Sequence, residues 1–323
     1  FARDGIQPAT FLALADQGAP EQEKSQVGYH LWQTDDPIPL QTDSATTIVN
    51  IGVGPWLNRV TQSKDFDPIL KWLEEATGYD CVLNISPNYE SLKSDLLNGY
   101  IDVAILSAAA YSNVLSMPDT QTHYIATVVA GSKKNPDTYY RGYIFTREDS
   151  APQGLQSLKS KPFAFVDRGS SSGFQYPMAL LLNSGIVPSK DFQSVFYLGS
   201  HDRVVSAVVD KQVYGGAVWD DTLVSAQNAG NKFKVLAKTA PIPREAWVAG
   251  AKVKAEVIEK IRSSLLAADL KSKTKNGQLA LDGGYLYSGF KVESPAFYKG
   301  VQAMKDVLRK FGELSPAGSD DAN

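Results

Sequence analysis

Cysteine and histidine are scarce in this chain. Its 323 residues include one cysteine, Cys81, and three histidines. A single cysteine excludes a disulfide bond within the chain, and one cysteine with three histidines cannot form a closed zinc site. The sequence also lacks an H-E-x-x-H motif, a G-x-x-x-x-G-K-[ST] phosphate loop and a G-x-G-x-x-G dinucleotide motif. We therefore expect no bound metal and no cofactor.

Long apolar runs and blocks of positive charge are missing as well. No run approaches the roughly 18 apolar residues of a membrane span. Lysine and arginine are scattered, and the formal net charge is −3, which argues against nucleic acid as a partner. The hydrophobic share of 43% and the charged share of 21% are typical of a soluble globular protein. The length allows two domains.

Strands and helices are expected to alternate through most of the chain, which predicts βαβ units around parallel sheets. The expected strands are 47–53, the segment around Cys81, 101–106, 163–166, 194–197 and 216–219. The expected helices are 67–77, 89–98 with Gly99 at its end, a helix opening near Pro177, 204–211, 254–269 and 296–311.

The order of these elements predicts an α/β fold of two lobes that form a clamp. Each lobe is expected to hold a mostly parallel sheet flanked by helices, with hinge crossings at 141–147 outward and 235–250 back. Ligands of such sheets bind outside the carboxyl ends of the strands, which face the cleft in a clamp. The expected parts are an N-terminal extension (1–45), lobe 1 (46–141 plus 245–314), lobe 2 (142–244) and a disordered tail (315–323).

The most informative segment is residues 169–173, Gly-Ser-Ser-Ser-Gly, which we call the serine loop. It lies between the strand 163–166 and the helix that opens near Pro177. The first turn of a helix has unpaired backbone N–H groups and a partial positive charge. Three serine hydroxyls add further donors, so the segment suits a tetrahedral oxyanion. The alternative is a serine-rich helix cap without a ligand, because serine is a favoured cap.

The serine loop also matches the G-x-S-x-G pattern of serine hydrolases, with Ser171 at the nucleophile position. The triad of that fold runs in the order serine, acid, histidine. His201 is the only histidine after Ser171, which leaves Asp191 as the main candidate acid. About thirty residues is little chain in which to place both groups on later strands. A serine esterase is therefore an alternative but not the preferred function.

Several segments, in the same order, resemble periplasmic phosphonate-binding proteins and their phosphite- and phosphate-binding relatives. Residues 167–174, Asp-Arg-Gly-Ser-Ser-Ser-Gly-Phe, are similar to the family pattern D-P-x-S-T-S-G-[YF]. Residues 199–202 read Gly-Ser-His-Asp, and residues 216–221 read Gly-Ala-Val-Trp-Asp-Asp. The chain departs from the family at Arg168, usually proline, and at Ser171, usually threonine. The resemblance spans about 46–311.

The resemblance implies a substrate-binding subunit of an ABC importer and not an enzyme. Such a subunit captures a phosphonate or related phosphorus oxyanion by hinge closure and delivers it to the membrane subunit. The implied location is periplasmic or otherwise extracytoplasmic, free or lipid-anchored; the chain begins at Phe1, so no signal peptide is visible. An extracytoplasmic sensor of a signalling receptor is a further alternative. Residues after Phe311 look like a terminus, which favours the importer subunit.

The resemblance also implies the ligand-binding residues. The implied oxyanion donors are Ser170, Ser171, Ser172, His201, Tyr89 and Tyr140, with Tyr139 as an alternative to Tyr140. In aminoalkylphosphonate binders of the family, carboxylates hold the ligand ammonium group; the matching positions are Asp202, Asp221 and Glu245. On this basis we expect an aminoalkylphosphonate to bind more tightly than phosphate.

Each of these residues also has an alternative role that does not involve a ligand. His201 would cap or pack, the tyrosines would lie on surface strands, and residues 220–221 would cap the following helix. Arg141 and Arg203 would instead pair with a second anionic group.

Overall fold

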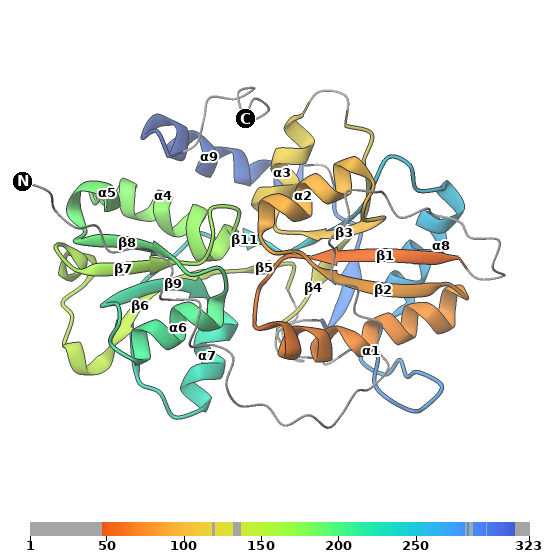
Figure 1. Ribbon diagram of the computed structural model, residues 1–323, viewed down its shortest axis with the longest axis horizontal. Coiled ribbons are helices and arrows are strands. Elements are labelled where there is room, and N and C mark those ends of the chain that lie inside the picture. The colour runs from red at the N-terminus through yellow and green to blue at the C-terminus, as the bar shows by residue number, and fades with distance from the viewer. Residues whose placement is uncertain are drawn as a thin grey trace, which may run out of the picture. The chain divides into compact units, whose positions relative to one another are not determined.

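The computed structural model describes residues 47–117, 120–131, 137–281, 283, 287–294 and 296–313. These residues all belong to one compact unit of the chain, and Figure 1 shows helices on both faces of its sheets. The expectations for the N-terminal extension and for the tail 315–323 fall outside the described residues.

The first lobe is built on a sheet whose strands lie in the order β13-β4-β12-β3-β1-β2. β1 pairs in parallel with β2 and with β3, whereas β12 is antiparallel to β3 and β4, and β13 is antiparallel to β4. The strands are β1 (Ile48–Val53), β2 (Asp80–Ile85), β3 (Val103–Leu106), β4 (His123–Val129), β12 (Ala246–Ala249) and β13 (Gly289–Lys291). The helices are α1 (Arg59–Thr77), α2 (Tyr89–Asn98), α3 (Ala108–Ser116) and α8 (Ala255–Ala267).

The second lobe is built on a sheet in the order β10-β6-β9-β7-β8. β7 is parallel to β8 and β9, and β6 is antiparallel to both of its neighbours. The strands are β6 (Gly142–Arg147), β7 (Pro162–Phe165), β8 (Ser194–Tyr197), β9 (Gly215–Trp219) and β10 (Phe233–Lys238). The helices are α4 (Tyr176–Asn183), α5 (Pro188–Asp191), α6 (His201–Val209) and α7 (Asp220–Asn228), with short 3₁₀ turns η2 (Glu148–Ser150) and η3 (Leu155–Leu158).

Two crossings connect the lobes and pair with each other. β5 (Tyr139–Tyr140) leads out of the first lobe and β11 (Ile242–Pro243) leads back, and these short strands form an antiparallel ladder. Each crossing enters its new sheet against the direction of the parallel strands, which explains why β6 and β12 are antiparallel. The α/β clamp of two lobes, each a sheet flanked by helices, and the two crossings are confirmed. Both sheets are mixed, because β6 and β12 run antiparallel to their neighbours.

The central strands form the core of each lobe. Every residue of β3, β9 and β12 is buried, as expected for strands that are covered by helices on both faces. The C-terminal helix α9 (Gly300–Lys310), which follows the 3₁₀ turn η5 (Phe297–Lys299), packs against α4 of the second lobe and α3 of the first.

The helix ends show where the local sequence was sufficient to predict a helix boundary. The expected helix 89–98 is present as α2: the Asn88 side chain accepts a hydrogen bond from the N–H of Ser91, and Gly99 closes the helix with φ of 81°. The expected helix 67–77 begins earlier, at Arg59, because Asn58 caps it through the N–H of Thr61. Pro68 lies inside this helix, where a break would be the usual expectation. No element was predicted for α3 or β4.

Candidate functional site

The serine loop opens a π-helical turn, η4 (Ser171–Gln175), that continues into α4. The hydroxyl of Ser170 accepts a hydrogen bond from the N–H of Gly173 at 3.1 Å and so caps this turn. The side chains of Ser170, Ser171 and Ser172 are 1–2% exposed. Pi turns occur often at functional sites because they redirect a helix end. The predicted arrangement of strand, serine turn and helix is therefore present.

Two buried tyrosines meet the serine loop from other elements. Tyr89, the first residue of α2, lies against Gly169 of the serine loop, where a Cβ would overlap the Tyr89 Cβ, and its phenol interacts with the Ser170 side chain. Tyr140, at the end of β5, interacts with the Ser172 side chain. Burial raises the pKa of both tyrosines, so each phenol stays protonated and remains a donor. The structure thus brings five of the predicted oxyanion residues together, one from the first lobe, one from a crossing and three from the second lobe.

The N-terminus of α3 also faces the serine loop, which the sequence did not reveal. The hydroxyl of Ser107, the cap of α3, donates to the carbonyl of Gly169 at 3.1 Å. The N–H of Ala109 donates to the hydroxyl of Ser171 at 3.0 Å. A second helix terminus, with its own backbone donors, therefore meets the first. The signal would have been the Ser-Ala-Ala-Ala run at 107–110, which is a helix start.

Gly142 allows the serine loop to lie against the outward crossing. A Cβ at this position would lie 2.6 Å from the carbonyl oxygen of Ser172. Gly169 plays a similar role between the lobes, because a Cβ there would overlap the Cβ of Tyr89. In both places the backbone approaches too closely for any larger residue.

His201 opens α6 and is fully enclosed. Its Nδ1 accepts a hydrogen bond from the N–H of Trp219 at 3.2 Å, so Nε2 carries the proton and is a donor. The imidazole stacks on the Trp219 ring at 5.5 Å, and Trp219 in turn meets the Tyr140 ring at 6.4 Å. Burial lowers the pKa of His201 to about 3. His201 is thus a neutral donor beside the tyrosine that contacts Ser172; its role at the ligand stays a prediction.

Asp202 lies in a different environment from the serines. Its carboxylate accepts hydrogen bonds from the N–H of Asn58 at 3.0 Å and from the hydroxyl of Ser200 at 2.5 Å. Asn58 belongs to the first lobe and caps α1, so Asp202 connects the two lobes. In the same region, the N–H of His201 donates a hydrogen bond to the carbonyl of Trp56 at 3.0 Å, which is a second contact between the lobes. Among the described interactions none joins Asp202 to the serine loop.

Asp221 and Glu245 belong to an acidic cluster that includes Asp220. Asp220 and Asp221 form the first turn of α7; the N-cap position is Trp219, which makes no side-chain capping bond, and Asp220 accepts from the N–H of Asp221 at 3.1 Å. Glu245 is 6% exposed on the return crossing, and burial raises its pKa. Burial and the neighbouring Asp221 raise the pKa of Asp220 to about 6.

Arg244 is the cation of this cluster, and the sequence analysis missed it. Its guanidinium is 3.6 Å from the carboxylate of Asp221 and lies over the Tyr140 ring at 5.4 Å. The residue is 3% exposed. Arg141 borders the cluster through its backbone, whose N–H donates to Asp220 at 3.3 Å, while its guanidinium donates to the carbonyl of Thr239. Arg168 lies over the ring of Tyr197.

The serine hydrolase triad is not assembled in the described part of the chain. The hydroxyl of Ser171 is bonded to Ala109, and Nδ1 of His201 is bonded to Trp219. The candidate acid, Asp191, accepts from the N–H of Val187 at 2.7 Å and pairs with Lys159 at 3.5 Å. A nucleophile needs its base within hydrogen-bond reach and the base needs an orienting acid, and these three residues have other partners.

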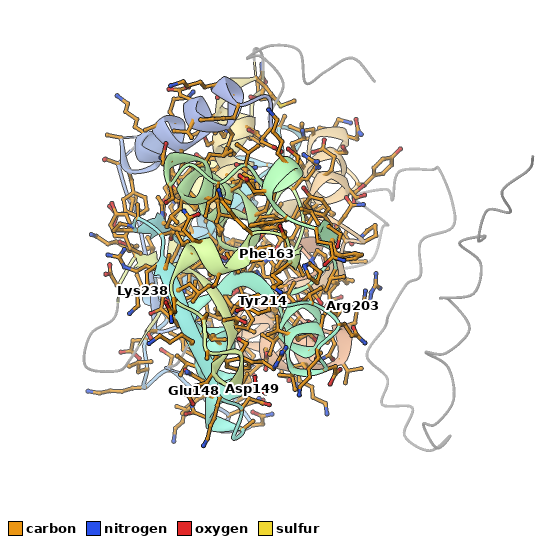
Figure 2. The ribbon with its side chains drawn as sticks, turned by 90° about the vertical axis from the view of Figure 1, so that its left-hand side faces the viewer. Glu148, Asp149, Phe163, Arg203, Tyr214 and Lys238 are labelled. Atoms are coloured by element: carbon orange, nitrogen blue, oxygen red, sulfur yellow. The ribbon has the colours of Figure 1, made fainter. Side chains whose placement is uncertain are left out.

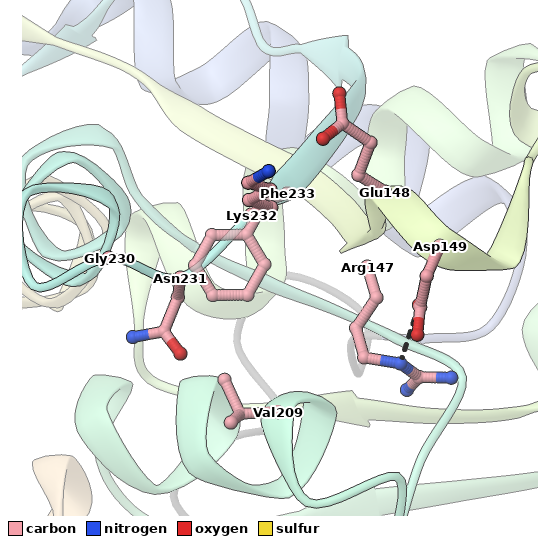
Figure 3. Close-up of a pocket in the computed structure, with 8 residues that line it drawn as sticks. All are labelled: Arg147, Glu148, Asp149, Val209, Gly230, Asn231, Lys232 and Phe233. Atoms are coloured by element: carbon pink, nitrogen blue, oxygen red, sulfur yellow. Dashed lines mark hydrogen bonds and ion pairs between the residues drawn. The ribbon is translucent and has the colours of Figure 1, made fainter.

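A pocket of about 440 Å³ lies at the opposite end of β6 from the serine loop (Figure 3). Its lining includes Arg147, which pairs with Asp149 at 3.1 Å, and Phe233. Figure 2 shows Glu148 and Asp149 side by side at this end of the second lobe. β6 begins at Gly142, beside the serine loop, and ends at Arg147, so this pocket is separate from the predicted site.

Within the described ranges, no group of three or more histidine, cysteine or acidic side chains is placed to hold a metal ion. Nor does any helix in those ranges combine the length and the apolar character that crossing a membrane requires.

Comparison with known proteins identifies the family. A family model described as the periplasmic phosphonate substrate-binding protein of an ABC transporter matches residues 51–296. The chain belongs to this family. The phosphonate-binding resemblance and the importer-subunit function are thereby confirmed, and the esterase and sensor alternatives have no support. Members of this family are extracytoplasmic transport components and not enzymes.

Individual relatives are distant in sequence. The chain is 24% identical over 257 residues to the phosphate-import protein PhnD of Mycolicibacterium smegmatis, covering 76% of this chain and 79% of the relative. PhnD1 of Prochlorococcus marinus, solved with methylphosphonate, is 17% identical with a TM-score of 0.70, covering 83% and 99% of the two chains. A binding component of an ABC phosphonate transporter from Pseudomonas aeruginosa is 18% identical, also with a TM-score of 0.70, covering 85% and 91%. At these identities the structures support the fold alone.

Proposed function

We propose that this protein captures a phosphorus oxyanion between its lobes at the serine loop and delivers it to the membrane subunit of an ABC importer. The observation that carries the proposal is the meeting of Tyr89 and Tyr140 with Ser170 and Ser172. These hydroxyls come from the first lobe, a crossing and the second lobe, so an anion held among them binds both lobes at once.

The energetics are sufficient for tight binding. Each hydrogen bond to a charged group contributes roughly 1.5–3 kcal/mol net, and the helix terminus adds about 0.3–2 kcal/mol. Three to five such bonds offset desolvation of the anion and ordering of the crossings. Micromolar affinity requires only about −8 kcal/mol.

The proposed binding set is the one predicted from sequence. Ser170, Ser171, Ser172, Tyr89 and Tyr140 would surround the oxyanion, with His201 as an additional donor. Asp221 and Glu245 would border the site beyond Tyr140, and Asp202 would act between the lobes. As a location we propose the extracytoplasmic side of the membrane, with the chain either free or held by a lipid anchor.

Isothermal titration calorimetry tests this function directly. The purified protein is titrated with phosphate, phosphite, methylphosphonate and 2-aminoethylphosphonate, and with sulfate as a tetrahedral anion without phosphorus. We expect at least one phosphorus compound to bind with micromolar or tighter affinity and sulfate to bind more weakly. Absence of binding for all four phosphorus compounds would overturn the proposal.

A further inference from the structure

The acidic cluster lies next to the proposed oxyanion site. Tyr140 connects the two: the guanidinium of Arg244 lies over its ring at 5.4 Å, and Gly142, two residues further on, lies against the carbonyl of Ser172. The cluster contains three carboxylates, those of Asp220, Asp221 and Glu245. Like charges brought together at a buried interface cost several kcal/mol. An incoming phosphorus dianion would therefore be repelled unless a cation compensated the cluster.

Arg244 supplies that cation from within the protein. Its side chain is 4% exposed and lies 3.6 Å from Asp221. Its guanidinium also stacks on Tyr140, 5.4 Å from the ring centroid, in a cation–π contact that orients both groups. Its positive charge acts on Asp220 and on Glu245, where it opposes the rise in pKa that burial causes.

The backbone of Arg244 is fixed as firmly as its side chain. Its N–H donates to the carbonyl of Thr138 on the outward crossing at 2.8 Å. Its carbonyl accepts a hydrogen bond at 3.0 Å from the hydroxyl of Tyr298. A buried arginine held in this way is a permanent part of the site.

Each carboxylate of the cluster already has a partner within the protein. Asp221 pairs with Arg244, and Asp220 accepts from the N–H groups of Arg141 at 3.3 Å and Asp221 at 3.1 Å. The positive charge of Arg244 also acts on Glu245. An ammonium group on the ligand would compete with these donors and would meet the guanidinium as a like charge.

We propose that Arg244 is a resident counter-ion that determines ligand class: it selects a phosphorus oxyanion without a cationic group and disfavours one that carries an ammonium group. The proposal rests on the proposed function. It reverses the ligand preference expected from the sequence, which considered Asp221 and Glu245 without Arg244. Arg244 acts here as a specificity-determining residue through charge, next to the tyrosine that contacts the serine loop.

Two ligands of equal size test the proposal. Ethylphosphonate and aminomethylphosphonate differ only in a terminal methyl or ammonium group, and calorimetry gives the ratio of their affinities. For the wild-type protein we expect ethylphosphonate to bind at least about tenfold more tightly. In Arg244→Gln the ratio should fall by at least about tenfold, because the carboxylates then lack their cation. Arg244→Lys keeps the charge and should restore most of the wild-type ratio.

A matched control separates charge at this position from loss of any arginine. Arg309→Gln removes an arginine that pairs with Asp306 at 3.0 Å on α9, and it should leave the ratio unchanged. If Arg244→Gln does not fold, Asp221→Asn provides the reciprocal change. That variant keeps Arg244, removes one negative charge and should shift the ratio further toward ethylphosphonate.

The outcomes distinguish this proposal from the proposed function. If wild-type protein binds ethylphosphonate no more tightly than aminomethylphosphonate, or if the ratio is the same in wild type, Arg244→Gln and Asp221→Asn, the role of Arg244 is overturned. Either result leaves the oxyanion site intact as long as methylphosphonate, phosphite or phosphate binds. Absence of all phosphorus ligands overturns the proposed function, and this inference with it.

Discussion

Ser171 and Ser172 have different partners although they are adjacent. Ser171 accepts from Ala109 across the lobes, whereas Ser172 lies against Gly142 and interacts with Tyr140 at the crossing. Each serine is therefore oriented by a separate element. In the proposed function, the serine hydroxyls would bind the ligand and the tyrosines would close the site around it.

Replacing Ser171 and Ser172 by alanine should weaken binding of the tightest phosphorus ligand by roughly 2–4 kcal/mol, because two donors to a charged group are lost. Calorimetry on the double variant measures the change. Ser184, directly after α4, and Ser263, within α8, are exposed serines, so Ser184→Ala with Ser263→Ala is the matched control. Unchanged affinity in the Ser171 and Ser172 variant would remove the serine loop from the site.

His201 gives the protein a defined pH dependence. Below the ordinary pKa of 6.5 the unfolded chain binds a proton at this histidine, whereas in the folded protein burial lowers the pKa to about 3. The contribution of this pKa difference to the unfolding free energy is therefore fully present above pH 6.5 and is lost as the pH falls toward 3. The loss amounts to a few kcal/mol, since each pH unit of difference corresponds to about 1.4 kcal/mol.

The measurement is the unfolding free energy of wild type and His201→Gln in urea between pH 7 and pH 4. The wild type should lose more stability over this range, because glutamine does not titrate. Asp220 has a raised pKa and acts in the opposite direction, but it is present in both proteins and drops out of the difference. Parallel pH profiles would show that His201 is not buried in its neutral form.

Local sequence pattern predicted the placement of these residues only where they are close in the chain, whereas Tyr89 and Tyr140 were predicted from the family resemblance. The serine loop follows its strand directly, so its place at a helix terminus could be predicted. Arg244 and Asp221 are far apart in the chain, and their ion pair depends on how the return crossing lies beside α7. The same holds for Ala109 and Ser171, which are 62 positions apart. The spacing of residues along the sequence does not predict contacts between such distant positions.

At the scale of elements, β6 and the π turn are packed against each other through Gly142. Any Cβ at Gly142 would meet the backbone carbonyl of Ser172 at 2.6 Å, and backbone cannot rotate away as a side chain can. The turn must therefore move to accept a larger residue. Its three serines would then shift relative to Tyr140.

Gly142→Ala should weaken ligand binding by about tenfold or more, because small displacements of positioned groups are costly. It should also lower the unfolding free energy by about 1–3 kcal/mol through overpacking. Gly289→Ala, at the start of β13, is the control, since nothing lies within 4 Å of a Cβ there. Equal affinities for the two variants would mean that the approach of β6 does not position the serine loop.

Element boundaries were predictable where caps are local and not where the pattern is ambiguous. Asn88 and Gly99 determine both ends of α2 within the helix itself. The side chain of Asn58 caps α1 at Arg59, earlier than the predicted start at residue 67, and Pro68 does not break the helix. α3 was not predicted: its N-terminal alanines also suit a buried loop, and its place is set by packing against the serine loop and α9.

At the scale of the whole molecule, the lobes make specific contacts on several sides of the site. Trp56 of the first lobe packs on Trp219 of the second, with ring centroids 6.3 Å apart. Asn58 donates to Asp202, and the hydroxyl of Ser107 donates to Gly169. Contacts of this kind stabilise a closed arrangement, which is the form that a transporter distinguishes from the open one.

Gly169 is the position where this closure can be tested. It belongs to the second lobe, and a Cβ on it would overlap the Cβ of Tyr89 in the first. Gly169→Ala should therefore oppose closure without disturbing either lobe, and ligand affinity should fall by about 10–100-fold, because the closed form supplies the Tyr89 donor.

In small-angle X-ray scattering, saturating ligand should reduce the radius of gyration of the wild type more than that of the Gly169→Ala variant. Gly300→Ala, where a Cβ has nothing within 4 Å, should behave as wild type. If Gly169→Ala contracts fully and binds with wild-type affinity, the contact between Tyr89 and Gly169 does not limit closure, and Tyr89 reaches the ligand by another route.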